Sequence, residues 1–144
     1  MSKVSGYHTT EKGTKLPLIS LKGKNYLQVA HRIVWFREMY PKGIIKTQMI
    51  QDQNDSATFR AEIFVPGDND GMPIMVSTGH KSENSVAFPD YREKAETGAI
   101  GRALALMGIG TQFCEVELDE GTRLADSPID SPKRDKPSFI NGDL

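Results

Sequence analysis

Alternation between apolar and polar side chains in residues 57–65 constrains the fold more than any other feature of the sequence. Five apolar residues recur there at every second position: Ala57, Phe59, Ala61, Ile63 and Val65. A period of two is typical of a β-strand that is buried on one face. Runs of strand composition also cover roughly 43–51 and 73–81, and turn-forming segments at 52–55 and 66–72 separate the three runs. The sequence therefore predicts a three-stranded antiparallel meander.

Two helices are predicted to flank this meander. From Asn25 to Tyr40, apolar residues recur at spacings of three and four, with Asn25 suited to the N-cap and Pro41 ending the helix. A second helix is expected from Pro89 to about Met107, with Gly108 beyond its end. The predicted fold class is α+β, in the order helix, three-stranded antiparallel β-meander and long helix packed on the sheet.

The length and charge of the chain suggest one compact domain with two tails. A chain of 144 residues that is 38% apolar can bury one core. We expect a flexible leader at 1–20 whose last part docks on the core, a domain at 21–121, and a disordered acidic tail with several prolines at 122–144. Residues 1–113 hold 14 Lys and Arg against 11 Asp and Glu, whereas 114–144 hold 4 against 8. The positive part suits contact with an anion.

Signatures of the common enzyme and metal-binding classes are absent from the sequence. It contains no phosphate-binding GxxxxGK[ST] loop, its three histidines lie far apart, and Cys114 is its only cysteine. We therefore expect a protein that is not an enzyme and has no catalytic residue, metal or cofactor. A single cysteine fits a reducing compartment, and no run of about 18 apolar residues indicates a membrane span. The expected location is the cytoplasm of a bacterial host, without a membrane partner.

The second predicted helix keeps one surface nearly bare. Gly98, Gly101 and Ala105 follow one stripe of this helix. Each interior glycine costs about 1 kcal/mol relative to alanine, so another group is expected to approach this stripe closely. The sequence leaves three candidates open, namely the meander of the same subunit, a neighbouring subunit and a nucleic-acid backbone.

The same helix carries a resemblance to a known family. Its pattern A-x-T-x-x-x-x-R-A-L followed by glycine, after a helix and a meander, resembles the single-strand annealing proteins related to eukaryotic Rad fifty-two and phage Erf. The matching positions are Ala95, Thr97, Arg102, Ala103, Leu104 and Gly108, and the resemblance covers roughly residues 25–112. It implies ATP-independent binding of single-stranded DNA and annealing of complementary strands in phage-type recombination and repair. It also implies a homo-oligomer, either a ring or a filament.

Binding of single strands requires cations that follow the phosphates and flat side chains on which bases stack. On adjacent strands, Lys46, Arg60 and Lys81 can meet on one face if the register allows it, and Phe64 lies on the polar side of its strand. Compared with the eukaryotic relatives, the second helix is less basic, because Gly101 and Ala105 stand where basic residues are expected. The candidate DNA-binding residues are Lys42, Lys46, Arg60, Phe64, His80, Lys81, Arg92, Lys94 and Arg102.

Two other functions remain open at this point. One is a plain single-stranded DNA-binding protein that protects DNA without annealing it. The other is an oligomeric adaptor that does not bind DNA and recruits replication or recombination proteins through its acidic C-terminal tail. A salt-dependent DNA-binding measurement separates the adaptor from both DNA-binding functions.

Overall fold

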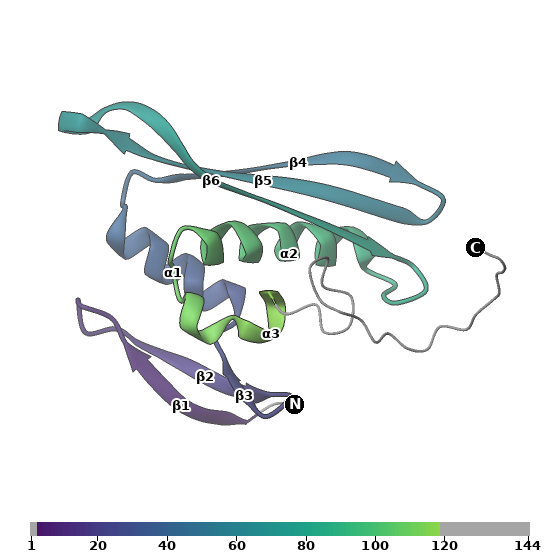
Figure 1. Ribbon diagram of the computed structural model, residues 1–144, viewed down its shortest axis with the longest axis horizontal. Helices are drawn as coiled ribbons and strands as arrows, with labels where there is room; N and C mark the ends of the chain where they lie inside the picture. The colour runs from purple at the N-terminus through teal and green to yellow at the C-terminus, as the bar shows by residue number, and fades with distance from the viewer. Residues whose placement is uncertain (1–2, 119–144) are drawn as a thin grey trace, which may run out of the picture.

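The computed structural model describes residues 3–118 and shows three layers (Figure 1). The helices lie between two three-stranded antiparallel sheets, one of order β1-β2-β3 and the other of order β4-β5-β6. The tail predicted for 122–144 lies outside the described residues. Within those residues, no helix is long and apolar enough to cross a membrane.

The first sheet is formed by β1 (Val4–Thr9), β2 (Lys15–Leu21) and β3 (Lys24–Tyr26). Most of the segment that we predicted as a flexible leader is therefore a β-hairpin. Leu16 and Leu18 form a buried cluster with Leu27, and the partly buried rings of Trp35 and Phe113 pack against it. Burial of these leucines holds the hairpin on the rest of the molecule, and this agrees with the docking expected for the last part of the leader.

Helix α1 spans Val29–Met39 and starts later than the sequence periodicity predicted. Residues 24–26 pair with β2 instead, with Tyr26 opposite Ile19 and Lys24 opposite Leu21. Asn25 is consequently a strand residue, and Gln28 occupies the N-cap position. The predicted helix ran through this strand because Tyr26 happens to match the helical spacing of Val29 and Ile33.

The predicted meander is confirmed as β4 (Ile44–Gln53), β5 (Ser56–Gly67) and β6 (Gly71–Asn84), with the short 3-10 helix η1 (Asp68–Asp70) between the last two. Both pairs of neighbouring strands are antiparallel. Ala57, Ala61 and Ile63 of β5 are completely buried, whereas Thr58 and Arg60 between them are partly exposed. The alternation in the sequence thus marks the face of β5 that is turned toward the helices.

Helix α2 (Tyr91–Leu106) packs on this inner face of the meander and is followed by η2 (Thr111–Phe113) and α3 (Glu115–Leu118). The main core contains Phe36 from α1, residues from β5 and α2, and Ile109. A Cβ atom at Gly79 of β6 would lie 2.5 Å from the carbonyl oxygen of Ala99 in α2. Only glycine at this position lets the helix approach the sheet so closely. The predicted fold class is confirmed.

Candidate nucleic-acid interface

One face of the meander is not covered by any helix of residues 3–118, and we call it the outer face (Figure 1). The side chains that alternate with the buried residues of β5 lie on it, among them Arg60, Glu62 and Phe64. The strand register aligns them with side chains of the neighbouring strands. Three rows result, which are Gln48–Arg60–His80, Lys46–Glu62–Thr78 and Ile44–Phe64–Met75.

Polar and aromatic contacts connect these rows. Nε of Arg60 lies 2.8 Å from Oε2 of Glu62, and its Nη1 lies 3.5 Å from Nε2 of His80. The Lys46 ammonium lies 5.6 Å from the centre of the Phe64 ring, within the range of a cation–π contact. Glu62 offsets part of the positive charge. The outer face thus presents two fixed cations, a histidine and an aromatic ring on an open sheet.

Lys81 does not join Lys46 and Arg60, so the expected grouping of these three residues is wrong. Lys81 pairs with Phe59, and it is His80 that pairs with Arg60. Neighbouring residues of a strand point to opposite faces, so Lys81 is directed toward α2. Its methylene groups lie against Gly98, and its ammonium lies 3.6 Å from Oε2 of Glu83.

The other predicted cations do not gather on the outer face either. Lys42 precedes β4 and forms an exposed ion pair of 3.2 Å with Asp70, and Arg92 of α2 forms one of the same length with Asp52. The Lys94 ammonium lies 5.5 Å from the centre of the Phe88 ring. Arg102 donates a hydrogen bond of 3.4 Å to the carbonyl oxygen of Glu117. Arg92, Lys94 and Arg102 lie on α2, and Lys42 lies in the turn before β4. All four contact groups of their own chain away from the outer face.

The glycine-rich stripe of α2 also faces its own chain. A Cβ atom at Gly98 would meet the Lys81 side chain, and one at Gly101 would meet Glu117 of α3 and Val29 of α1. Ala105 is 2% exposed. Of the three candidates for close approach, the structure therefore places elements of the same subunit against this stripe.

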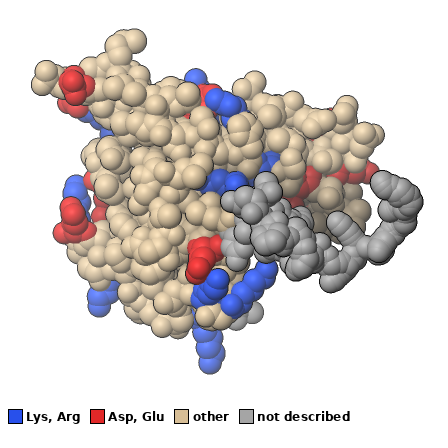
Figure 2. Space-filling view, in the orientation of Figure 1, with Lys and Arg blue, Asp and Glu red and all other residues tan. Residues whose placement is uncertain are grey.

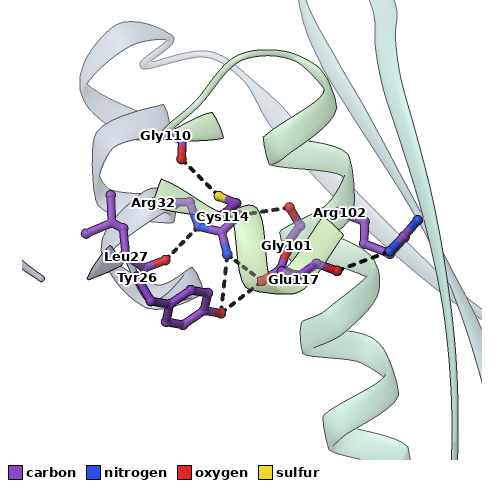
Figure 3. Close-up of polar contacts among 8 residues, drawn as sticks. All are labelled: Tyr26, Leu27, Arg32, Gly101, Arg102, Gly110, Cys114 and Glu117. Carbon is purple, nitrogen blue, oxygen red and sulfur yellow. Dashed lines mark hydrogen bonds and ion pairs between the residues drawn. The ribbon is translucent and has the colours of Figure 1, made fainter. Parts of the chain in front are cut away.

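A buried polar cluster around Arg32 was not foreseen (Figure 3). Arg32 is completely buried and donates hydrogen bonds of 2.9 Å to the carbonyl oxygens of Leu27 and Gly101. Its Nη2 lies 2.7 Å from Oε1 of Glu117, which also accepts a hydrogen bond from Tyr26. Burial and the neighbouring Glu117 carboxylate raise the pKa of Tyr26 to about 12.

One sequence signal for this cluster existed. Arg32 lies three residues after Val29 and four before Phe36, so it occupies the buried stripe of α1. A charged residue in such a stripe needs a partner, although the sequence does not show which one. Because the partners of Arg32 are groups of the same chain, the cluster joins α1, α2, α3 and the end of β3. Its role is structural.

The hollows in the surface of the described residues include two of similar size. One, of about 650 Å³, lies between the β1–β2 turn and α1 and is lined by residues that include His8, Trp35 and Glu38. The other, of about 710 Å³, lies at the end of α1 beside Tyr40 and Asp70. Between residues 3 and 118, no three His, Cys, Asp or Glu side chains are placed to hold a metal ion.

Comparison with known proteins corrects the resemblance drawn from the sequence. Residues 33–107 match the family described as Slr1353 N-terminal dsRNA-binding domain-like, and no curated protein matches the chain significantly. The expected membership of the Rad fifty-two and Erf-like annealing proteins is therefore wrong. The residues that suggested it explain the error, because Ala95, Ala103 and Leu104 are completely buried. Their pattern reflects the packing of a helix on a sheet and is not specific to annealing.

The matched segment runs from within α1, through the whole β4–β5–β6 meander, to the end of α2. It is just over half of the chain and leaves β1, β2 and β3 outside. The description of the matched family refers to nucleic-acid binding, which agrees with the general kind of partner expected from the sequence, and it does not mention single-stranded DNA, recombination or assembly. The chain belongs to the Slr1353 N-terminal dsRNA-binding domain-like family.

Proposed function

We propose that this protein is a non-enzymatic nucleic-acid-binding protein that holds single strands on the outer face and promotes pairing of complementary strands without ATP. One observation carries the proposal, namely that the register of the meander brings Lys46, Arg60 and Phe64 together on the outer face. The nucleic-acid-binding description of the matched family supports the same class of ligand.

The chemistry of the outer face suits a single strand. Lys46 and Arg60 supply positive charge for phosphates, and the partly exposed Phe64 ring offers a surface on which a base can stack. Thr58 and Ser82 lie side by side on the face, with 2.5 Å between their hydroxyl oxygens, and add groups that hydrogen-bond to sugars or bases. A strand held on an open sheet leaves its other side accessible to a complementary strand, and pairing requires this access.

The binding test compares the wild type with K46Q/R60Q in titrations of a labelled single-stranded oligonucleotide at several salt concentrations. The logarithm of the binding constant falls linearly with the logarithm of the salt concentration, and each phosphate that is neutralised on a single strand contributes about 0.7 to the slope. Loss of two such contacts should therefore weaken binding by the double variant about 25-fold at 0.1 M salt. The matched control is K42Q/R92Q, which removes the same charge from exposed ion pairs away from the outer face. Equal reductions of affinity in both double variants would contradict a localised interface.

A second experiment tests pairing. Two complementary oligonucleotides are mixed with the protein in the absence of nucleotide, and duplex formation is followed over time. The proposal expects faster duplex formation than in the protein-free reaction and a smaller acceleration with K46Q/R60Q. Tight binding without acceleration would leave the protein with a purely protective role.

Binding of double-stranded RNA is a second candidate function, and the description of the matched family favours it. Domains that bind duplex RNA read its shape, with contacts to 2′-hydroxyls and phosphates across about 16 base pairs. A 20-base-pair RNA duplex, a DNA duplex of the same length and the corresponding single strands distinguish the two candidates. A clear preference for the RNA duplex would overturn the single-strand proposal.

Assembly into a homo-oligomer remains a prediction, but it now rests on an edge strand of the meander and no longer on the stripe of α2. The glycine-rich stripe of α2 is covered by the same subunit, but β4 is an edge strand of the meander and exposes Met49 and Ile50. Exposed edge strands are surfaces on which another strand can pair. Light scattering at micromolar concentration tests this prediction, and a monomer would contradict it.

A further inference from the structure

Positive charge is concentrated in the N-terminal sheet. Residues 3–28, which contain β1, β2 and β3, hold five lysines and one glutamate, a net charge of +4. Residues 29–118 hold nine basic and twelve acidic residues, a net charge of −3. The sheet that lies outside the matched family segment is therefore the most cationic part of the described chain. In Figure 2, Lys and Arg side chains project from the lower part of the molecule, where Figure 1 shows this sheet.

One face of this sheet is directed away from the helices. His8 and Leu16 are paired and point inward, because Leu16 is buried and the His8 ring lies 4.6 Å from that of Trp35. Their strand neighbours, Tyr7 and Pro17, form the next pair and therefore point outward. Tyr7 is 60% exposed, which is unusual for an aromatic side chain that serves only packing.

The lysines flank Tyr7 along the direction of β2. Lys12 and Lys15 lie at one end of β2, and Lys22 and Lys24 lie at the other. Lys24 forms an ion pair of 3.4 Å with Glu115, whereas no ion pair between residues 3 and 118 includes Lys15 or Lys22. An exposed aromatic ring between uncompensated cations is the combination that binds single-stranded nucleic acid without sequence preference.

We propose that the outward face of β1–β2–β3 is a second nucleic-acid-binding surface, on which Tyr7 stacks with a base and Lys15 and Lys22 contact phosphates. This inference takes from the proposed function only that nucleic acid is the ligand, and it does not depend on the outer face of β4–β5–β6. The two sheets lie on opposite sides of the helices (Figure 1), so two short strands can bind one molecule at the same time. Simultaneous binding of two strands would assist their pairing.

The test uses the full-length protein and an oligothymidine of about four nucleotides, the smallest site size of known single-strand-binding folds. The variants are K15Q/K22Q, which removes charge, and K15R/K22R, which keeps it. The controls are K42Q/R92Q for removal of charge elsewhere, and Tyr7→Phe beside Tyr7→Ser for stacking. Isothermal titration gives affinity and stoichiometry, and circular dichroism checks the fold. All of these side chains are exposed, so the substitutions should leave folding intact.

K15Q/K22Q is expected to bind one oligonucleotide fewer per protomer than the wild type. The two substitutions remove two phosphate contacts, so the affinity of the affected site for the oligonucleotide should fall about 25-fold at 0.1 M salt. K15R/K22R and Tyr7→Phe should retain both sites, and Tyr7→Ser should weaken one of them. Wild-type stoichiometry and affinity in K15Q/K22Q would overturn the inference.

The variants of the two sheets separate this inference from the proposed function. If K15Q/K22Q loses a site and K46Q/R60Q does not, the N-terminal surface stands and the outer face of the meander is refuted as an interface. If only K46Q/R60Q loses a site, the proposed function stands and the second surface is refuted. Vesicles containing phosphatidylserine provide a further arm, because weaker vesicle binding with unchanged oligonucleotide binding would identify the lysine surface as a membrane contact and overturn the inference.

Discussion

Nη2 of the Arg32 guanidinium lies 2.7 Å from Oε1 of Glu117, in the space where α1, α2 and α3 meet (Figure 3). Arg32 is completely buried, and the Glu117 side chain is 15% exposed. The same guanidinium also donates to the carbonyl oxygen of Gly101. A buried arginine is costly unless its donors and its charge are satisfied, so this pair ties the short helix α3 to the core.

Replacement of Glu117 by alanine should destabilise the fold strongly. Arg32 would keep its two bonds to carbonyl oxygens but lose its counter-ion, and removal of one partner of a buried pair costs about 3–5 kcal/mol. Because water has partial access to Glu117, we expect a loss at the lower end of this range, about 3 kcal/mol. The loss is measured as the decrease in the free energy of unfolding in urea. Glu115→Ala is the control, because its exposed pair with Lys24 should contribute less than about 1 kcal/mol. Similar losses of stability in both variants would refute the special role of Arg32.

Gly79→Ala should separate α2 from the sheet. The new Cβ atom would lie 2.5 Å from the carbonyl oxygen of Ala99 and 2.6 Å from the amide nitrogen of Ala103. These are backbone atoms of α2, which cannot move out of the way by rotation about a side-chain bond. We expect a loss of at least about 1–3 kcal/mol in thermal or urea unfolding. Gly6→Ala is the control, because a Cβ atom at this position of β1 would meet no other atom within 4 Å. A neutral Gly79→Ala would contradict the close packing.

Gly101→Leu tests whether the glycine-rich stripe of α2 faces its own subunit. The first atom of the new side chain would lie 2.5 Å from Oε2 of Glu117 and 2.9 Å from Cγ2 of Val29. Overpacking should lower the melting temperature by an amount equivalent to about 1–3 kcal/mol. The size of the wild-type particle in light scattering should not change, provided that the variant is folded. A folded variant with wild-type stability and a smaller particle would show that the stripe contacts a neighbouring subunit.

Stability should fall in alkaline solution because of Cys114. Burial of this thiol raises its pKa from the usual 9.0 to about 11, while the unfolded chain keeps the usual value. Above pH 9 the unfolded state loses its proton first, so the stabilisation present below pH 9 is lost as the pH rises toward 11. Urea unfolding of wild type and Cys114→Ala across pH 8–11 measures this effect. The variant should lose less stability between pH 9 and 11, and parallel pH profiles would exclude the thiol as the cause.

The meander could be predicted from the sequence because its cause is local. Alternation along β5 separates Ala57, Ala61 and Ile63 from Thr58 and Arg60, and any strand with this pattern buries the apolar set. For the same reason, Phe64 was expected on the polar side of its strand, where the structure places it. Helix α2 was recognisable from its spacing, but the motif within it led to the wrong family, since its alanines reflect packing that many helices share.

The candidate site depended on relationships between segments that are distant in the sequence. Whether His80 or Lys81 lies beside Arg60 follows from the β5–β6 register, and a shift by one residue exchanges them. The N-terminal sheet was missed for a similar reason, because Leu16 and Leu18 alternate over too few residues to stand out without the partner cluster that buries them.

The sequence by itself determined which residues form the meander and α2 and which face of β5 is buried, because these properties depend on residues a few positions apart. Tertiary structure alone decided that Arg32 pairs with Glu117, that Gly101 lies against Val29, and that Leu16 and Leu18 pack with Leu27. The contact between Arg32 and Glu117 joins groups 85 positions apart. Contacts between such distant segments form only when burial of the whole core offsets the entropy that is lost in bringing the segments together. A local sequence pattern cannot predict them, because this free energy depends on the whole fold.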